Sequence, residues 1–168
     1  MGGPLWKRKT VLASRGMVNH GFVNVKNQKI PSILWFESRW TETVDFFQLS
    51  LNWVRLSKPE IGMLHLFTDA EKPSLQTAAG GSFSVGSFGG PAKPGLPNIG
   101  WAMVYGAEYA VEVDVGAICA AGFPVEHIDG AVIIRVTDSL SDVVNNFAFF
   151  TRRRAELKLL FRPGLFWI

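Results

Sequence analysis

The residues of this sequence that could most readily bind a metal ion or transfer protons are its three histidines, His20, His65 and His127. They lie far apart, in none of the short spacings that are typical of zinc ligands. No serine or cysteine nucleophile stands in a recognisable motif with any of them, although a hydrolase site could still assemble from distant residues. The sequence therefore predicts no catalytic residue and no metal site.

A glycine-rich stretch from Gly80 to Gly100 has the composition of a phosphate-binding loop. It lacks the Gly-Lys-Ser/Thr ending of such loops and does not lead from a strand directly into a helix. Its glycines and prolines are typical of turns in a surface connection. The sequence therefore predicts no bound cofactor.

Acidic residues are more informative than the histidines. Between Lys93 and Arg135 the chain carries five carboxylates and no lysine or arginine. These acids indicate either an ordinary solvated face or a docking surface for a basic protein partner, which a negative surface attracts and orients. In the second case the partner-binding residues are Glu108, Glu112, Glu126 and Asp129.

The net charge of +3 conceals an uneven distribution of charge along the chain. Residues 1–36 hold six basic residues and no acid, and the remaining 11 basic and 14 acidic residues leave the rest of the chain at −3. The high sequence pI of about 9.2 therefore reports the N-terminal segment. For that reason the charge does not predict a nucleic-acid partner.

Residues 1–29 show neither helical nor strand periodicity, so we expect a basic arm or residues translated from an early start codon that lie outside the fold. Residues 30–168 are expected to form a single domain. The charge-free apolar stretch Val115–Val125 is much shorter than the roughly 20 residues that cross a bilayer, so no membrane span is predicted. The single cysteine, Cys119, lies among Ala and Ile, which predicts a buried thiol in a reducing, cytoplasmic compartment.

The central stretch Gly100–Val136 predicts a strand, a short helix and a hairpin in succession. The strand covers Trp101–Tyr105, and Asp114 is a good cap for a helix over Val115–Ala121. The dipeptide Asp129-Gly130 between two apolar runs is a strong signal for a two-residue hairpin turn. The hairpin strands are therefore expected at Val125–Ile128 and Ala131–Val136.

The flanking segments predict further strands and two long helices. The first helix should begin at a cap on Ser38 or Thr41 and run to about Leu56, because an apolar stripe repeats along it. The second should run over Ser141–Leu160, with an irregularity near Asn145-Asn146. The remaining strands are expected at Ser32–Phe36, Met63–Phe67 and Ser82–Phe88.

Together these elements predict an α+β fold: a mostly antiparallel sheet of about five or six strands with two long helices packed on it. The last helix carries a run of three arginines, which point about 100° apart and cannot form one surface. Arg154 falls on the apolar stripe, so its side chain should reach the edge of the core. Arg152 and Arg153 should be solvated.

Trp101, the Gly106–Tyr109 segment (GAEY), the short helix and the hairpin resemble the C-terminal half of small bacterial proteins grouped as type VI secretion immunity-like. The resemblance implies a cytoplasmic protein without catalytic activity that blocks a toxin by binding it. Two other hypotheses come from the residues alone. One is a small-molecule or catalytic pocket near Trp101, Tyr105 and His65, and the other is a structural subunit whose basic arm enters a larger assembly.

Overall fold

The structure is a computed structural model that describes residues 5–8, 12–27, 29–30, 32–68, 96 and 98–166. Its described residues fall into two compact units, one up to Val44 and one from Asp45 onward. Helices and antiparallel strands occur together, which confirms the predicted α+β class. The predicted strand at Ser82–Phe88 lies outside the described residues.

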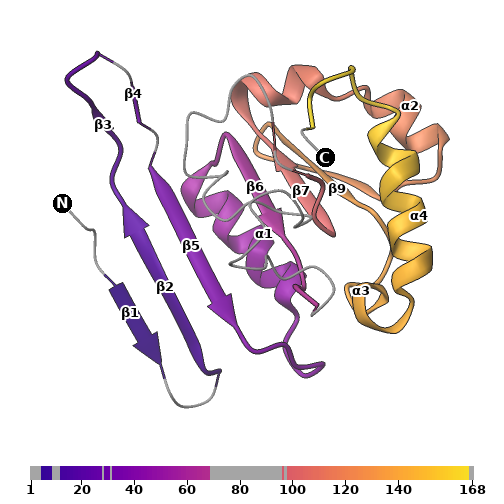
Figure 1. The fold of residues 1–168 in the computed structure, drawn as a ribbon, viewed down its shortest axis with the longest axis horizontal. Helices are drawn as coiled ribbons and strands as arrows, with labels where there is room; N and C mark the ends of the chain where they lie inside the picture. The colour runs from indigo at the N-terminus through magenta and orange to yellow at the C-terminus, as the bar shows by residue number, and fades with distance from the viewer. Residues whose placement is uncertain are drawn as a thin grey trace, which may run out of the picture. The chain divides into compact units, whose positions relative to one another are not determined.

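The regular structure described in the first unit consists of strands (Figure 1). An antiparallel sheet of order β1-β2-β5 forms from β1 (Leu5–Arg8), β2 (Ser14–Asn19) and β5 (Ile33–Ser38). A second pair joins β3 (Phe22–Val23) to β4 (Lys29–Ile30). The strand predicted at Ser32–Phe36 is thus present as β5, whereas β1 and β2 lie in the stretch that we expected to be an arm.

The three-stranded sheet has large apolar side chains that stay accessible. Leu34 and Trp35 point to opposite faces of β5, and they are 43% and 41% exposed. Arg15 lies over the Trp35 ring and forms an ion pair of 2.7 Å with Glu37. Among the described residues up to Val44, Gly16 is the one that is buried. The described side chains of this sheet therefore form no buried core. The sheet joins strands from both sides of the boundary expected at residue 29.

The second unit is built on a four-stranded antiparallel sheet of order β6-β7-β9-β8. Its strands are β6 (Ile61–Leu64), β7 (Ala102–Tyr105), β8 (Val125–Ile128) and β9 (Ala131–Arg135). Four strands are fewer than the predicted five or six, because β5 pairs within the other unit. The hairpin strands β8 and β9 lie where the sequence predicted them.

The helices are α1 (Phe46–Ser57), the 3-10 helix η2 (Ala107–Glu112), α2 (Val115–Ala120), α3 (Asp142–Asn145) and α4 (Phe147–Lys158). The start predicted for α1 was wrong, because the Asp45 carboxylate caps the helix by accepting a hydrogen bond of 2.8 Å from the Gln48 amide. Asp114 caps α2 in the same way, as predicted. The expected irregularity near Asn146 is the break between α3 and α4.

One face of the four-stranded sheet packs against α1. Leu51 and Val54 of this helix form a buried cluster with Val104, Ala131 and Ile133 of the two central strands. Because side chains alternate along a strand, these three share one face of the sheet. Burial of that cluster is what holds α1 in place.

The opposite face packs against α4 and the residues after it, and Figure 1 shows α1 and α4 on opposite sides of the sheet. Tyr105 stacks with Phe161 at 5.4 Å between ring centroids. Phe150 of α4 stacks at 5.6 Å on His65, which follows β6. The two long helices therefore cover the two faces, and β7 and β9 are buried on both.

The hairpin turn has the backbone that its sequence demands. Asp129 and Gly130 have φ values of 49° and 86°, and β8 and β9 pair directly from Ile128 and Ala131 onward. Two successive positive φ values are those of a type I′ turn, which matches the right-handed twist of the strands.

We expect Gly130→Ala to lower the free energy of unfolding by about 1 kcal/mol, because alanine is strained at this φ although nothing stands within 4 Å of its Cβ position. The matched control is Gly116→Ala on α2, where the nearest atom is the Asp114 carboxylate at 3.5 Å and φ is not positive. The control should keep or raise stability. Urea unfolding of both variants tests this, and equal effects would contradict the turn geometry.

Candidate functional site

Glu112, on η2, is neutralised by an arginine. Its carboxylate accepts hydrogen bonds from Arg162 Nε at 2.7 Å and Nη2 at 3.0 Å, a bidentate arrangement. The bond to Glu112 raises the pKa of Arg162, against a smaller opposing effect of burial. Glu112 therefore contributes little net negative charge to the surface.

Glu126, on β8, is also paired. Its carboxylate lies 3.3 Å from Arg135 Nη2, and the Arg135 guanidinium lies over the ring of Phe47 at 4.7 Å. The aromatic contact holds the arginine against α1, and the arginine in turn holds the carboxylate. Two of the four predicted partner-binding acids thus have structural ion pairs.

The other two predicted acids, Glu108 on η2 and Asp129 in the hairpin turn, are exposed. A third exposed acid, Glu60, lies at the same end of the sheet and was not predicted from the sequence. Its carbonyl accepts a hydrogen bond of 2.9 Å from the Gly106 amide, next to the start of η2. Burial raises the pKa of the Tyr109 hydroxyl, and the charges of Glu60 and Glu112 raise it further.

The sheet register explains why distant residues meet at this end. Ile61 pairs with Tyr105, Tyr105 with Val132, and Val132 with His127. The residues just beyond this row are therefore Glu60 before β6, Gly106 after β7 and the hairpin turn. Nothing in the local sequence around Glu60 signals this, because only strand pairing brings it there. We call Glu60, Glu108 and Asp129 the acidic end.

A pocket of about 300 Å³ lies at this end of the sheet. It is lined by Val54, Lys58, Pro59, Gly106, Ile128, Asp129, Gly130 and Ala131. Gly106 is required there, because an added Cβ would collide with the carbonyl oxygen of Pro59. The pocket therefore depends on a close approach of two backbone segments.

Trp101, Tyr105 and His65, the residues of the alternative pocket hypothesis, do not line this cavity. Trp101 is buried, with its amide donating to His65 Nδ1 at 3.1 Å and its indole Nε1 donating to Thr137 at 3.0 Å. Tyr105 is also buried, which raises its pKa, and its hydroxyl has no hydrogen-bond partner among the described residues. Trp101 and Tyr105 are packed in the core of the second unit, and the half-buried His65 stacks on Phe150.

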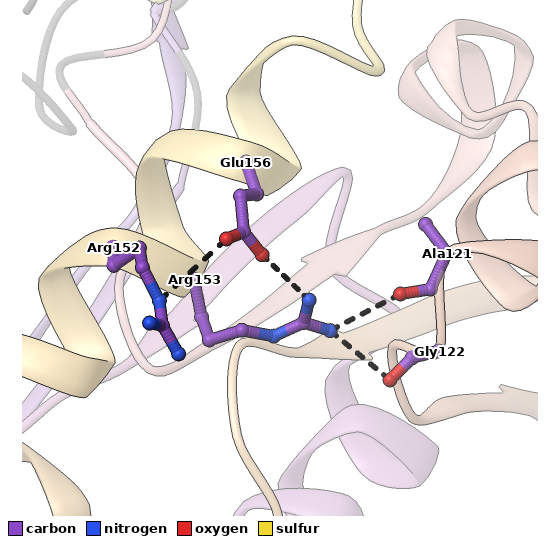
Figure 2. Close-up of polar contacts among 5 residues, drawn as sticks. All are labelled: Ala121, Gly122, Arg152, Arg153 and Glu156. Carbon is purple, nitrogen blue, oxygen red and sulfur yellow. Dashed lines mark hydrogen bonds and ion pairs between the residues drawn. The ribbon is translucent and has the colours of Figure 1, made fainter.

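The arginine run behaves differently from the prediction at one position (Figure 2). Arg154 is buried, as expected, with its guanidinium 4.9 Å from the Phe150 ring centre. Arg153 was expected in solvent, but its Nη2 donates to the carbonyls of Ala121 and Gly122 at 3.2 Å and 3.1 Å. These carbonyls end α2, where a helix lacks internal donors, so Arg153 joins α4 to α2.

Cys119 also differs from the prediction, since it is a free and exposed cysteine. Within the described part of the chain, no group of three or more His, Cys, Asp or Glu residues could hold a metal ion. No helix in that part has the length and apolar character needed to span a membrane. No protein-family model, curated protein or solved structure matches the chain.

Arg153→Met should lower the free energy of unfolding by about 1–2 kcal/mol, because it leaves two helix-end carbonyls without their donor. The control is Arg152→Met, since Arg152 also faces Glu156 but its side chain is 67% exposed, against 20% for Arg153. The control should change stability by less than about 0.5 kcal/mol. Equal losses of stability in the two variants, measured by chemical denaturation, would contradict the role of Arg153 in joining α4 to α2.

Lys158 supplies a prediction about pH. Burial, with a smaller effect of nearby Arg154, lowers its pKa from 10.5 to about 8. Between these values the unfolded lysine binds the proton more than the folded one does, so its contribution to stability rises with pH. Lys158→Met should therefore be more stable than the wild type at pH 7, with a gain that shrinks from pH 8 to pH 10.5. A gain that does not change with pH would contradict this assignment.

Proposed function

We propose that this chain is a non-enzymatic binding protein that captures a basic protein partner with its acidic end, Glu60, Glu108 and Asp129. The observation that carries the proposal is that strand pairing brings the segments of these three exposed acids to one end of the sheet, where Asp129 also lines the pocket. Two of them, Glu108 and Asp129, are among the acids that the sequence singled out. Glu112 and Glu126 support the surface indirectly, because their ion pairs fix η2 and the hairpin.

The finer proposal is a bacterial, cytoplasmic immunity protein whose partner is a toxin. Its support is the resemblance of the Trp101–Phe161 region to immunity-like proteins. An inhibitor of this kind needs a rigid surface rather than reacting groups. The residues of the acidic end lie next to the start of β6, on η2 and in a tight turn rather than on a long loop, which favours a rigid surface.

Exposed acids at a sheet end should act mainly on the rate of association. Charges of one sign steer an oppositely charged partner before contact, and salt screens this attraction over roughly 8–10 Å at physiological ionic strength. The proposal therefore predicts fast, salt-sensitive capture.

The double variant Glu60→Lys with Glu108→Lys should keep the fold and reduce the association rate at low salt by about tenfold or more. Glu112 and Glu126 are left intact, because replacing them would break structural ion pairs. The measurement is surface plasmon resonance at several salt concentrations, with the protein products of neighbouring genes as analytes.

The control is Glu42→Lys with Asp138→Lys, which changes the net charge equally at two exposed acids that are not part of the acidic end. Asp138 follows the opposite end of β9. Equal losses in both double variants would overturn the acidic end as the binding surface. If no macromolecule binds but a small molecule raises the melting temperature, the small-molecule hypothesis replaces this one.

A further inference from the structure

We propose that the pocket beside the turn holds a single basic side chain, arginine or lysine, of the bound partner. This is the pocket of about 300 Å³ described above, which is lined by the end of α1, Pro59, Gly106 and residues 128–131. This inference rests on the proposed function, and it assigns an anchor site within the acidic end. A contact at such an anchor site is specific, in contrast to the diffuse attraction that surface charge exerts on a partner.

Two features of the lining favour a cation. The first is Asp129, whose carboxylate belongs to an exposed turn residue at the pocket wall. The second is the C-terminal end of α1, a 12-residue helix that ends in the pocket lining at its cap, Lys58. The aligned peptide dipoles of a helix place about half a negative charge at that end. Carbonyl and carboxylate oxygens are also the acceptors that an ammonium or guanidinium group needs.

The remaining walls suit the aliphatic part of such a side chain. Val54, Pro59, Ile128 and Ala131 supply apolar surface around the polar groups. Lysine and arginine bury their methylene stems against apolar surface while their charged ends meet acceptors. A cavity of this size is at the lower limit of small-molecule pockets, so one side chain fits it better than a whole ligand does.

Lys58 allows a second test, in which removing a charge should have the opposite effect on binding to removing that of Asp129. It lines the same pocket and brings the protein's own positive charge to it. An entering cation must therefore overcome this charge. Removing it should strengthen binding, whereas removing the Asp129 charge should weaken binding.

Lys58 and Asp129 both have positive φ, at 45° and 49°. Asparagine tolerates this backbone better than most residues, so Lys58→Asn and Asp129→Asn change the charge while preserving the cap and the turn. The probe is the peptide acetyl-Gly-Arg-Gly-amide, and its matched control has citrulline, a neutral isostere, in place of arginine. Binding to the full chain is followed by the amide NMR shifts of Gly106 and Gly130.

We expect the arginine peptide to shift both amides and the citrulline peptide to leave them unchanged. Asp129→Asn should weaken arginine-peptide binding several-fold, and Lys58→Asn should strengthen it several-fold. Equal shifts with both peptides, or the same sign of effect from both variants, would overturn the anchor site.

Ala131→Val separates the anchor from the proposed function, because it narrows the pocket and leaves every charge in place. It should abolish the arginine-peptide shifts but keep salt-dependent steering of the partner, with circular dichroism to confirm the fold. If arginine-peptide binding survives this change, the anchor is wrong even though the acidic end still binds a partner. If the Glu60→Lys, Glu108→Lys variant retains full partner capture, the proposed function itself fails.

Discussion

Burial of β7 and β9 on both faces is the constraint on which the second unit depends. Val104 and Ile133 pack against α1, whereas Tyr105 and its neighbours pack on the side of α4. A strand covered on both faces leaves no room for a solvated charge along its length, because burying an unpaired charge is costly. Exposed charges are therefore confined to the edges and ends of this sheet. The acidic end follows from that confinement.

Local signals in the sequence predicted the parts of the fold that local geometry determines. Asp129-Gly130 predicted the hairpin because the turn needs two positive φ values, and Asp114 predicted the start of α2 because a cap acts within one turn. The start of α1 was mispredicted because Ser38 and Thr41 are equally good caps on chemical grounds. Ser38 instead ends β5, so pairing with β2 prevents it from capping a helix.

Strands β1 and β2 of the first unit could not be predicted for a related reason. Alternation of apolar and polar residues arises when one face of a sheet is buried. None of the side chains described in β1 and β2 is buried, so no such alternation marks these strands, whereas the apolar run of β5 did predict a strand. In the candidate site, the exposure of Glu108 and Asp129 could be predicted from their neighbours. Glu60 could not, because the pairing of β6 with β7 alone brings it there.

The negative charge of the acidic end is also a consequence of where the arginines are used. Arg153 closes the end of α2, and Arg154 lies on the ring of Phe150. Arg162 and Arg135 hold η2 and the hairpin through Glu112 and Glu126. Arg153, Arg162 and Arg135 each stabilise a contact between elements, whereas Arg154 is buried against its own helix. An ordinary solvated face would mix both signs of charge. Here these arginines are committed to contacts within the protein, and the exposed acids Glu60, Glu108 and Asp129 stand at one end of the sheet. Asp129 lines a pocket there whose own cation, Lys58, sits at a helix end that already favours positive charge.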